Sequence, residues 1–421
     1  MRRSQILVLA LLGTALAVRL LFVLKFAPDL RFGDQDEYLD GARRLLAGEP
    51  LPLKNWMLFV RAPGYSTLIA AVWGLTGTTG SLTAIKIANA LLGTVMVGYV
   101  YLIARRLGGE RAGLIALATA ALYPYFIFHT GKVATETAFS ACVAAGAYHL
   151  AAGVPDAEHL DVPQLLLGSF FLSLGNMLRP NLSTILPFLG LWFLWRYRRR
   201  LSLVATGSAA FLGPLLAVSL PWSFAVAEQG LGWIFVTDGG GVYYFMGHND
   251  EAHRLFCEDA PAEERKRLLG FPGHKMFSQR PIYQEARSAP PAEQQGLFWK
   301  AALAWDRANL EKLPCLTINK FINYWRPWVN PIAYGSSMVA ISLTSLPVLF
   351  LGLYGVFQAF RKGERALAVF TAISLTAGTL VAVIFSTEIR YRIPVVDVLL
   401  TGFFGYAVNL LYVRRLERNS Q

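Results

Sequence analysis

Long apolar runs recur along nearly the whole chain and are separated by short polar stretches. A helix needs ~20 apolar residues to cross a bilayer, within a range of about 17 to 25. Ten runs are candidates for such spans, although several of them are short, and they lie near 6–26, 83–104, 112–129, 136–152, 164–178, 182–195, 203–224, 337–360, 366–386 and 393–413. The pattern predicts an all-α polytopic membrane protein with about ten transmembrane helices.

The first apolar run resembles a signal peptide at its start. Arg2-Arg3 precedes it, and Ala15-Leu16-Ala17 is similar to a cleavage site. The run continues through residues 20–24, well past that site. We therefore interpret it as an uncleaved membrane anchor.

Lysine and arginine collect in short clusters between the apolar runs. Under the ten-span interpretation these clusters fall on one side, which the positive-inside rule makes cytoplasmic. The clusters are Arg2-Arg3, Arg105-Arg106 with Arg111, Arg196 to Arg200, Arg361-Lys362 with Arg365, and Arg414-Arg415 with Arg418. A further span at 64–77 would reverse the later clusters, so we expect a helix there that lies in an outer loop and touches the membrane. Both termini are then expected inside.

Composition supports the membrane interpretation. Hydrophobic residues make up 54% of the 421 residues and charged residues 16%, whereas soluble domains carry about 25% charged residues. This excludes a soluble enzyme and a disordered chain. The net charge of +12 follows from the cytoplasmic clusters, so we predict no nucleic-acid partner.

Three regions follow from the placement of the spans. Residues 1–224 form an N-terminal transmembrane module that includes a first outer loop at 28–82, and residues 337–421 form C-terminal transmembrane helices. Between them, 225–336 is expected to be a small periplasmic loop domain. There we predict a helix around 292–312 with Ala301, Ala304, Trp305 and Ala308 on one face. Cys257 and Cys315 both lie in this domain, and whether they form a disulfide is left open.

Three carboxylates occur within four residues just beyond the first span, in Asp34-Gln35-Asp36-Glu37-Tyr38. Such a cluster repels itself unless it is protonated, paired or bound to a cation. A divalent metal or a role as general base would each explain it. A solvated helix start, with Asp34 or Asp36 near the N-cap, explains it equally well.

Further polar residues lie on the outer side. Glu136 begins the fourth span and either approaches the acidic cluster or stabilises that helix N-terminus. Arg61, Arg179, Arg390 and Arg392 run against the positive-inside rule. Guanidinium groups bind phosphate bidentately, so a lipid-linked phosphate is one explanation. Snorkelling and ion pairing are the other.

Other polar features give weaker signals. Gly239-Gly240-Gly241 lacks the lysine and Ser/Thr of a P-loop. His248-Asn249-Asp250 could supply ligands, although a polar surface explains it better. Arg19 is taken as the one clearly buried charge within a span.

An ordered set of motifs resembles the GT-C superfamily of membrane glycosyltransferases. More narrowly, the chain resembles bacterial relatives of protein O-mannosyltransferases, aminoarabinose transferases and galacturonic acid transferases. The motifs extend over nearly the whole chain and are GDQDEYLDGARRLLAGE, RAPGYSTLIAAVWGLTG, KIANALLGTVMVGYVYLIARRLGG, KVATETAF, LRPNL, GGGVYYFMGHND and RYRIP.

The resemblance implies an inverting transfer of a sugar from a polyprenyl-phosphate donor to an envelope lipid, glycan or protein. It implies that Asp34 is the essential acidic residue of the first outer loop, with Asp36, Glu37 and Tyr38 as its neighbours. Which of the three acids acts as the base is left open. Arg390 and Arg392 match the basic pair that faces the donor phosphate, and Arg179, Lys132 and Arg61 are expected to assist. A divalent metal, Mg²⁺ or Mn²⁺, would be held by Asp36, Glu37 or Glu136.

The expected location is the bacterial inner membrane, with a periplasmic active site. The main alternative function is a lipid or sugar transporter, which usually places charges at the bilayer midplane. The predicted spans are almost free of charge, which favours chemistry at the membrane surface. A non-catalytic scaffold is a third interpretation. The sugar, the acceptor and the oligomeric state are not readable from the sequence.

Overall fold

The computed structural model describes the chain except for residues 1–2, 31–32, 53, 56, 260, 262–279, 329–341, 364, 388 and 421. The described residues form helices and loops, and no strand occurs among them. The α-helices are α1 (Arg3–Leu21), α2 (Gln35–Leu46), α3 (Gly64–Thr76), α4 (Leu82–Leu122), α5 (Pro124–Thr130), α6 (Glu136–Gly153), α7 (Val162–Leu178), α8 (Leu186–Tyr197), α9 (Leu201–Val226), α10 (Gly240–Gly247), α11 (Asp250–Cys257), α14 (Pro281–Ser288), α15 (Gln294–Ala308), α16 (Leu313–Trp325), α19 (Ser345–Lys362), α20 (Arg365–Ile384), α21 (Ile389–Arg392) and α22 (Val398–Asn419).

Short 3₁₀ and π segments join several of these helices. They are η1 (Phe22–Phe26), η2 (Pro180–Thr184), η3 (Ala227–Leu231), η4 (Leu310–Lys312) and η5 (Ile393–Asp397). The prediction of an all-helical protein is confirmed.

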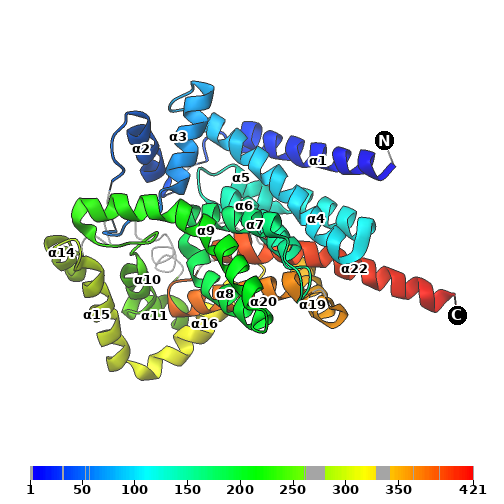
Figure 1. The fold of residues 1–421 in the computed structure, drawn as a ribbon. Helices are drawn as coiled ribbons and strands as arrows, with labels where there is room; N and C mark the ends of the chain where they lie inside the picture. The colour runs from blue at the N-terminus through cyan, green and yellow to red at the C-terminus, as the bar shows by residue number, and fades with distance from the viewer. Residues whose placement is uncertain are drawn as a thin grey trace.

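Different elements lie at the two ends of the molecule. The N- and C-termini, on α1 and α22, lie at the same end (Figure 1). Helices α2, α3, α10, α14 and α15 gather at the opposite end (Figure 1). The segments expected to face outward therefore lie together, away from both termini.

Five helical stretches among the described residues are long and apolar enough to cross a membrane: Ser4–Phe26, Leu82–Leu122, Leu201–Leu231, Arg365–Ile384 and Ile389–Asn419. The count of ten spans stays a prediction, and the first residues of the predicted span 337–360 lie outside the described residues.

Helix α4 contains the predicted span 83–104 and the first part of the predicted span 112–129. Its backbone leaves helical geometry at Gly108 and Gly109. A Cβ on Gly113 would lie 2.8 Å from the ring of Tyr101, whereas residues twelve apart in a straight helix are ~18 Å apart. The chain therefore folds back on itself at these glycines, in the middle of a cluster of arginines.

Small residues allow the central helices to approach closely. A Cβ on Gly355 of α19 would collide with the backbone of Phe403 in α22. A Cβ on Gly405 of α22 would lie 2.5 Å from the Ala112 carbonyl in α4. Such backbone contact is how membrane helices gain packing energy without a hydrophobic driving force.

Buried charges are more numerous than the sequence indicated, and the interpretation of Arg19 as the one buried charge is wrong. Asp397, within the predicted span 393–413, is fully buried with Arg392. Lys86, within the predicted span 83–104, is 1% exposed. The predicted spans are therefore not free of charge and do not by themselves exclude a transporter, although Lys86 and Asp397 both have partners.

Lys86 fixes the beginning of the first outer loop. Its ammonium donates to the carbonyls of Ala27 at 2.7 Å, Pro28 at 2.8 Å and Leu30 at 3.3 Å. These carbonyls follow the end of η1 and have no helical partner of their own. The loop therefore leaves the membrane anchor in a defined direction, four residues before Asp34.

The described part of the predicted outer domain contains α10, α11, α14, α15 and α16. The predicted helix around 292–312 is present as α15, but its predicted face is wrong. The buried side is formed by Phe298, Ala302 and Asp306, while Ala304 and Ala308 are exposed. Alanine spacing pointed to the wrong face because the residues packed against α10 include an aspartate. Cys257 and Cys315, left open above, form a disulfide between α11 and α16.

Candidate active site

A cavity of about 260 Å³ opens where segments far apart in the sequence meet. It lies among the N-terminal parts of α2 and α6, the end of α7, the beginning of α10 and the turn between α20 and α21. Its lining residues include Asp34, Tyr38, Phe59, Arg61, Glu136, Arg179, Asn181, Thr184, Thr237, Gly239, Gly240, Tyr243, Phe385, Ser386, Arg390 and Tyr391.

Asp34 stands at the N-cap position of α2, but its side chain makes no capping hydrogen bond within the described structure. Instead its carboxylate faces Arg61, with 3.7 Å between Oδ1 and Nη2. It is one-third exposed and lines the cavity. Of the two sequence-based explanations, the helix-start position is correct, while the carboxylate is directed to the cavity.

Arg61 gathers the acidic cluster around one guanidinium. Its Nε lies 2.6 Å from Glu37 Oε2, and its Nη1 donates to the Tyr38 hydroxyl at 3.1 Å. Burial lowers the pKa of Arg61, but Tyr38, Asp34 and Glu37 together raise it above its usual value. The self-repulsion that the sequence left unexplained is thus relieved by an ion pair.

The segment that carries Arg61 is held by residues that the sequence analysis missed. Asp238 accepts a hydrogen bond from the Val60 amide at 2.6 Å and lies 3.4 Å from Lys54 Nζ. Thr237 donates to the Val60 carbonyl at 2.6 Å. The aspartate and threonine just before Gly239 were the available signal, but nothing in the sequence indicated a partner 177 residues away.

Glu136 and Arg179 form a second ion pair on the cavity wall. Their Oε1 and Nη1 atoms are 3.0 Å apart, and the Glu136 side chain is 4% exposed. Glu136 begins α6, and Arg179 directly follows the end of α7. The Arg179 guanidinium lies 5.4 Å from the ring of Tyr391. Both predicted residues are therefore brought into the same cavity as Asp34.

The predicted basic residues separate into two groups. Arg390 lines the cavity, with its guanidinium 5.3 Å from the Tyr391 ring. Lys132 is buried, with its Nζ 4.4 Å from the centroid of the Phe128 ring. It is not among the described residues that line the cavity.

Arg392 is directed away from the cavity. Its guanidinium donates to Asp397 Oδ1 at 2.8 Å and Oδ2 at 3.3 Å. It also donates to the carbonyls of Tyr324 and Arg326. Arg392 is fully buried, so the structure does not bring it together with Arg390. The π segment η5 causes this, since it turns Asp397 back toward Arg392.

The three predicted metal ligands are not brought together. Asp36 is exposed, Glu37 is paired with Arg61, and Glu136 is paired with Arg179. Within the described part of the chain, no group of three His, Cys, Asp or Glu side chains is arranged to hold a metal ion. The expected metal set does not fit this geometry, because arginines supply the positive charge around these acids.

The sequence analysis also missed much of the uncharged wall. Tyr243 lines the cavity next to Phe59, with 5.4 Å between ring centroids. Burial raises the pKa of Tyr243. Gly239 and Gly240 bring backbone to the cavity surface, where a Cβ on Gly239 would press on the Phe59 ring at 3.1 Å. The triple glycine thus serves close approach rather than a P-loop.

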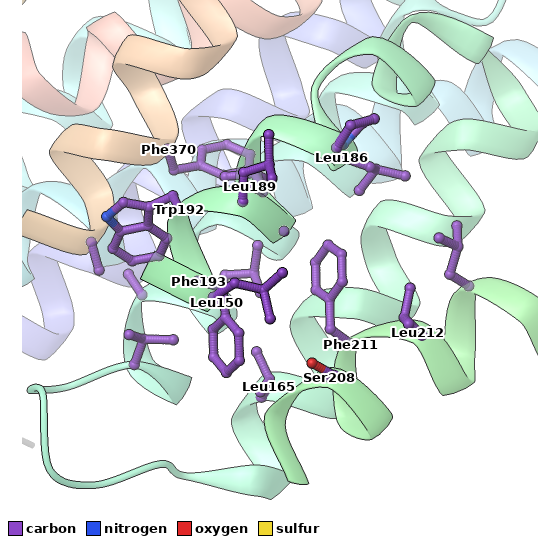
Figure 2. A pocket seen from close by; sticks show the side chains of 18 of the residues that line it. Leu150, Leu165, Leu186, Leu189, Trp192, Phe193, Ser208, Phe211, Leu212 and Phe370 are labelled. Atoms are coloured by element: carbon purple, nitrogen blue, oxygen red, sulfur yellow. The ribbon is translucent and has the colours of Figure 1, made fainter. Parts of the chain in front are cut away.

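Two larger cavities are almost wholly apolar. One, of about 820 Å³, lies among α3, α4, α6, α7 and α9 and shares Leu178 with the charged cavity. The other, of about 660 Å³, is lined by leucine and aromatic side chains of α7, α8, α9 and α20, with Ser208 at its edge (Figure 2). The second cavity shares no described lining residue with the charged one.

Comparison with known proteins agrees with the sequence resemblance. Residues 60–223 match the family described as dolichyl-phosphate-mannose-protein mannosyltransferase. No curated protein sequence gave a significant match.

Solved structures extend the comparison to the whole fold. The oligosaccharyltransferase AglB of Archaeoglobus fulgidus, in complex with an inhibitory peptide and a dolichol-phosphate, matches with a TM-score of 0.55 and 12% identity over 98% of this chain and 52% of that one. The same enzyme in complex with Zn and sulfate matches with a TM-score of 0.53 and 12% identity over 96% and 51%. ArnT of Cupriavidus metallidurans, bound to undecaprenyl phosphate, matches with a TM-score of 0.42 and 14% identity over 95% and 78%.

The chain spans about half the length of the archaeal enzyme it matches. At these identities the likeness concerns the fold, which is similar to that of the archaeal oligosaccharyltransferase. With the family match, it confirms the GT-C resemblance stated from the sequence.

Proposed function

From a GT-C-type fold with a charged cavity, we propose that this chain is an inverting membrane glycosyltransferase that uses a polyprenyl-phosphate sugar as donor. The observation that carries the proposal is the cavity that joins Asp34 to Arg179 and Arg390. Among the described lining residues, the carboxylates of Asp34 and Glu136 and the guanidinium groups of Arg61, Arg179 and Arg390 surround a space of about 260 Å³. Transfer from a lipid phosphate requires a base for the acceptor and positive charge for the leaving group.

Asp34 is the proposed general base. It accepts the proton of an acceptor hydroxyl, whose oxygen forms a bond to the anomeric carbon as the bond from that carbon to the phosphate oxygen breaks. The electron pair leaves with the polyprenyl phosphate. A single displacement of this kind inverts the anomeric centre and needs no covalent intermediate on the enzyme.

Arg179 and Arg390 are the proposed phosphate ligands. Guanidinium groups bind phosphate oxygens bidentately and stabilise the charge that develops on them. Lys132 adds positive charge from behind the wall. Arg61 orients Asp34 rather than binding the phosphate, since it is shared among Asp34, Glu37 and Tyr38. We leave Arg392 out of the set because Asp397 and two carbonyls occupy its guanidinium.

The proposed reaction uses no divalent cation, because Asp36, Glu37 and Glu136 are not brought together in the part of the chain that the structure describes. The archaeal enzyme in complex with Zn and sulfate shows that a neighbour in fold was solved with a metal. In this chain Arg61 occupies the position between two carboxylates where a cation would otherwise balance them.

The apolar cavity of about 820 Å³ is the proposed place for the lipid chain of the donor. It meets the charged cavity at Leu178 and is lined mainly by apolar side chains. The archaeal enzyme of similar fold was solved with an inhibitory peptide and a dolichol-phosphate, and also with a tethered acceptor peptide, which supports a lipid-linked donor and an envelope acceptor.

We also propose the arrangement expected from the positive-inside rule. The protein lies in the bacterial inner membrane with both termini in the cytoplasm and the cavity on the periplasmic face. Residues 1–224 and 337–421 then form the membrane part, and 225–336 the periplasmic domain. The location of both termini opposite to α2 and α15 supports this (Figure 1).

Asp34→Asn tests the proposal. Loss of a general base lowers turnover by roughly 10²–10⁴-fold. The measurement is a mass-spectrometric comparison of polyprenyl-phosphate lipids in cells that carry wild type or the variant. A sugar-charged lipid that accumulates only with Asp34→Asn supports the proposal, and its mass identifies the sugar.

Asp36→Asn is the matched control. Asp36 is exposed, lies two residues away and is not among the described cavity-lining residues. It should leave the lipid pool as in wild type. If Asp34→Asn behaves like Asp36→Asn while both proteins are present at normal levels, Asp34 is not the base.

A further inference from the structure

The wall of the charged cavity that bears Arg390 begins at the end of α20. Val381, Phe385 and Ser386 line the cavity there, and Arg390 follows within five residues of Phe385. Helix α20 ends at Ile384, so the carbonyls of its last residues, such as Val383 and Ile384, have no hydrogen-bond partners within the helix. Whatever binds these carbonyls also fixes the position of the wall.

Three side chains from the predicted outer domain bind these carbonyls. Lys320 Nζ donates to the Val383 carbonyl at 3.3 Å, and His248 Nε2 donates to the Ile384 carbonyl at 2.8 Å. Asn323 Nδ2 donates to the Thr387 carbonyl at 3.1 Å. Basic side chains at a helix C-terminus are favourable because they satisfy its carbonyls and its dipole.

His248 is itself held rigidly. Its Nδ1 lies 2.7 Å from Asp306 Oδ1, and its ring stacks on Tyr244 with 4.2 Å between centroids. The Tyr244 hydroxyl donates to the other oxygen of Asp306 at 2.5 Å. Both His248 and Asp306 are at least nine-tenths buried. The ring therefore has one orientation, with Nε2 directed at α20.

The backbone contact at this point is also close. A Cβ on Gly247 would collide with the carbonyl of Phe385 and would lie 2.8 Å from Lys320 Nζ. The end of α10 is thus pressed against the same stretch that His248 binds. A polar surface, which the sequence favoured for His248-Asn249-Asp250, does not describe His248.

Resting on the function proposed above, we propose that His248, with Lys320, is a positioning residue for the donor-phosphate wall, acting through the carbonyls of Ile384 and Val383 to place Arg390. His248 is not among the described residues that line the charged cavity. Its effect on phosphate binding acts through the carbonyl of Ile384 on the position of Arg390 and therefore requires Arg390.

The test measures binding of undecaprenyl phosphate to the purified full chain in lipid nanodiscs. His248→Phe keeps a ring to stack on Tyr244 but removes both hydrogen bonds. It should weaken binding roughly tenfold, as expected for loss of a buried hydrogen bond. His253→Phe is the control, since His253 lies in neighbouring α11 and contacts Glu258 rather than α20. It should bind within about twofold of wild type.

A double variant separates positioning from a general loss of structure. In an Arg390→Gln background, His248→Phe should cause no further weakening, because two changes that act through one contact are not additive. Equal weakening in both backgrounds, or no weakening in wild type, would overturn the inference. Wild type that fails to bind undecaprenyl phosphate would instead refute the proposed donor.

Asp306→Asn provides a second variant with a smaller change. It keeps the side-chain shape and removes the charge that orients His248, so binding should weaken by a few-fold. The melting temperature of each variant is recorded beside its binding constant. A lowered melting temperature with unchanged binding by the folded fraction would show that these residues serve stability alone.

Discussion

At the residue scale, buried charged side chains in this protein bind specific polar partners. Arg19 lies fully buried in α1 and donates to the carbonyls of Ala15, Ala120 and Ala121. The last two belong to the end of α4, where helical partners are missing. A charge that the sequence marked as costly therefore connects two helices.

Asp397 and Arg392 form the most deeply buried pair, which gives a stability prediction. Asp397→Asn leaves the Arg392 charge uncompensated and should destabilise the fold by about 3–5 kcal/mol. The melting temperature in detergent reports the loss. The double variant Arg392→Met, Asp397→Leu should recover much of it, since removing both charges is often neutral. A double variant as unstable as the single one would contradict this account.

The lowered pKa of Lys320 leads to a prediction of how the stability of the fold depends on pH. Burial lowers the pKa of Lys320 from 10.5 to about 7. Between these values the unfolded chain binds more protons than the folded one, so stability should rise with pH from about 7 to about 10.5. Below pH 7 both states are protonated and this dependence ends.

Lys320→Met provides the comparison for the pH effect. Thermal denaturation of wild type and variant is recorded between pH 6 and pH 10, and the difference between their melting temperatures should change with pH. Curves that remain parallel across this range would show that Lys320 does not titrate in it.

At the element scale, long-range contacts set the geometry of short helices. Helix α2 follows a loop fixed by Lys86, and the segment that carries Arg61 is held at Val60 by Thr237 and Asp238. In the predicted outer domain, the disulfide between Cys257 and Cys315 joins α11 to α16. Helix α16 also carries Lys320 and Asn323, so this cross-link stabilises the support of the α20 wall.

The disulfide leads to a prediction at this scale. The two cysteines are 58 residues apart, and a disulfide that closes a loop of this size contributes about 2–4 kcal/mol. Cys257→Ser should therefore lower the melting temperature and speed proteolysis between α11 and α16. Cys142→Ser is the control, because Cys142 is not in a disulfide. Equal behaviour of the two variants would contradict the prediction.

At the scale of the whole molecule, the apolar cavity of about 820 Å³ and the charged cavity form the proposed path for a lipid substrate. Val95 lines the apolar cavity and is 50% exposed, while Leu91, one turn earlier on α4, is 51% exposed and is not among the described lining residues. Val95→Trp should fill the cavity and raise the Kd for undecaprenyl phosphate by roughly tenfold. Leu91→Trp should leave it near the wild-type value. If both variants bind alike, the lipid chain lies elsewhere.

The sequence by itself determined the helical class and the membrane character, because apolar runs of fixed length and the clusters of basic residues are local properties. It also identified Asp34, Glu136, Arg179 and Arg390 as candidates, since a charge at a membrane surface requires a reason wherever it occurs. The ordered set of motifs also indicated the correct fold, because each motif is a local stretch of sequence.

Only the tertiary structure decided which charges share a cavity. Arg390 and Arg392 are two residues apart, yet Arg390 lines the cavity and Arg392 forms an ion pair with Asp397. Asp36 and Glu37 are adjacent, yet one is exposed and the other is paired with Arg61. The direction of each side chain and its partners from distant segments decide whether it lines the cavity. Neither can be deduced from the spacing of residues in the sequence. The assignment of Arg61, His248 and Lys320 to supporting roles depends on such contacts for the same physical reason.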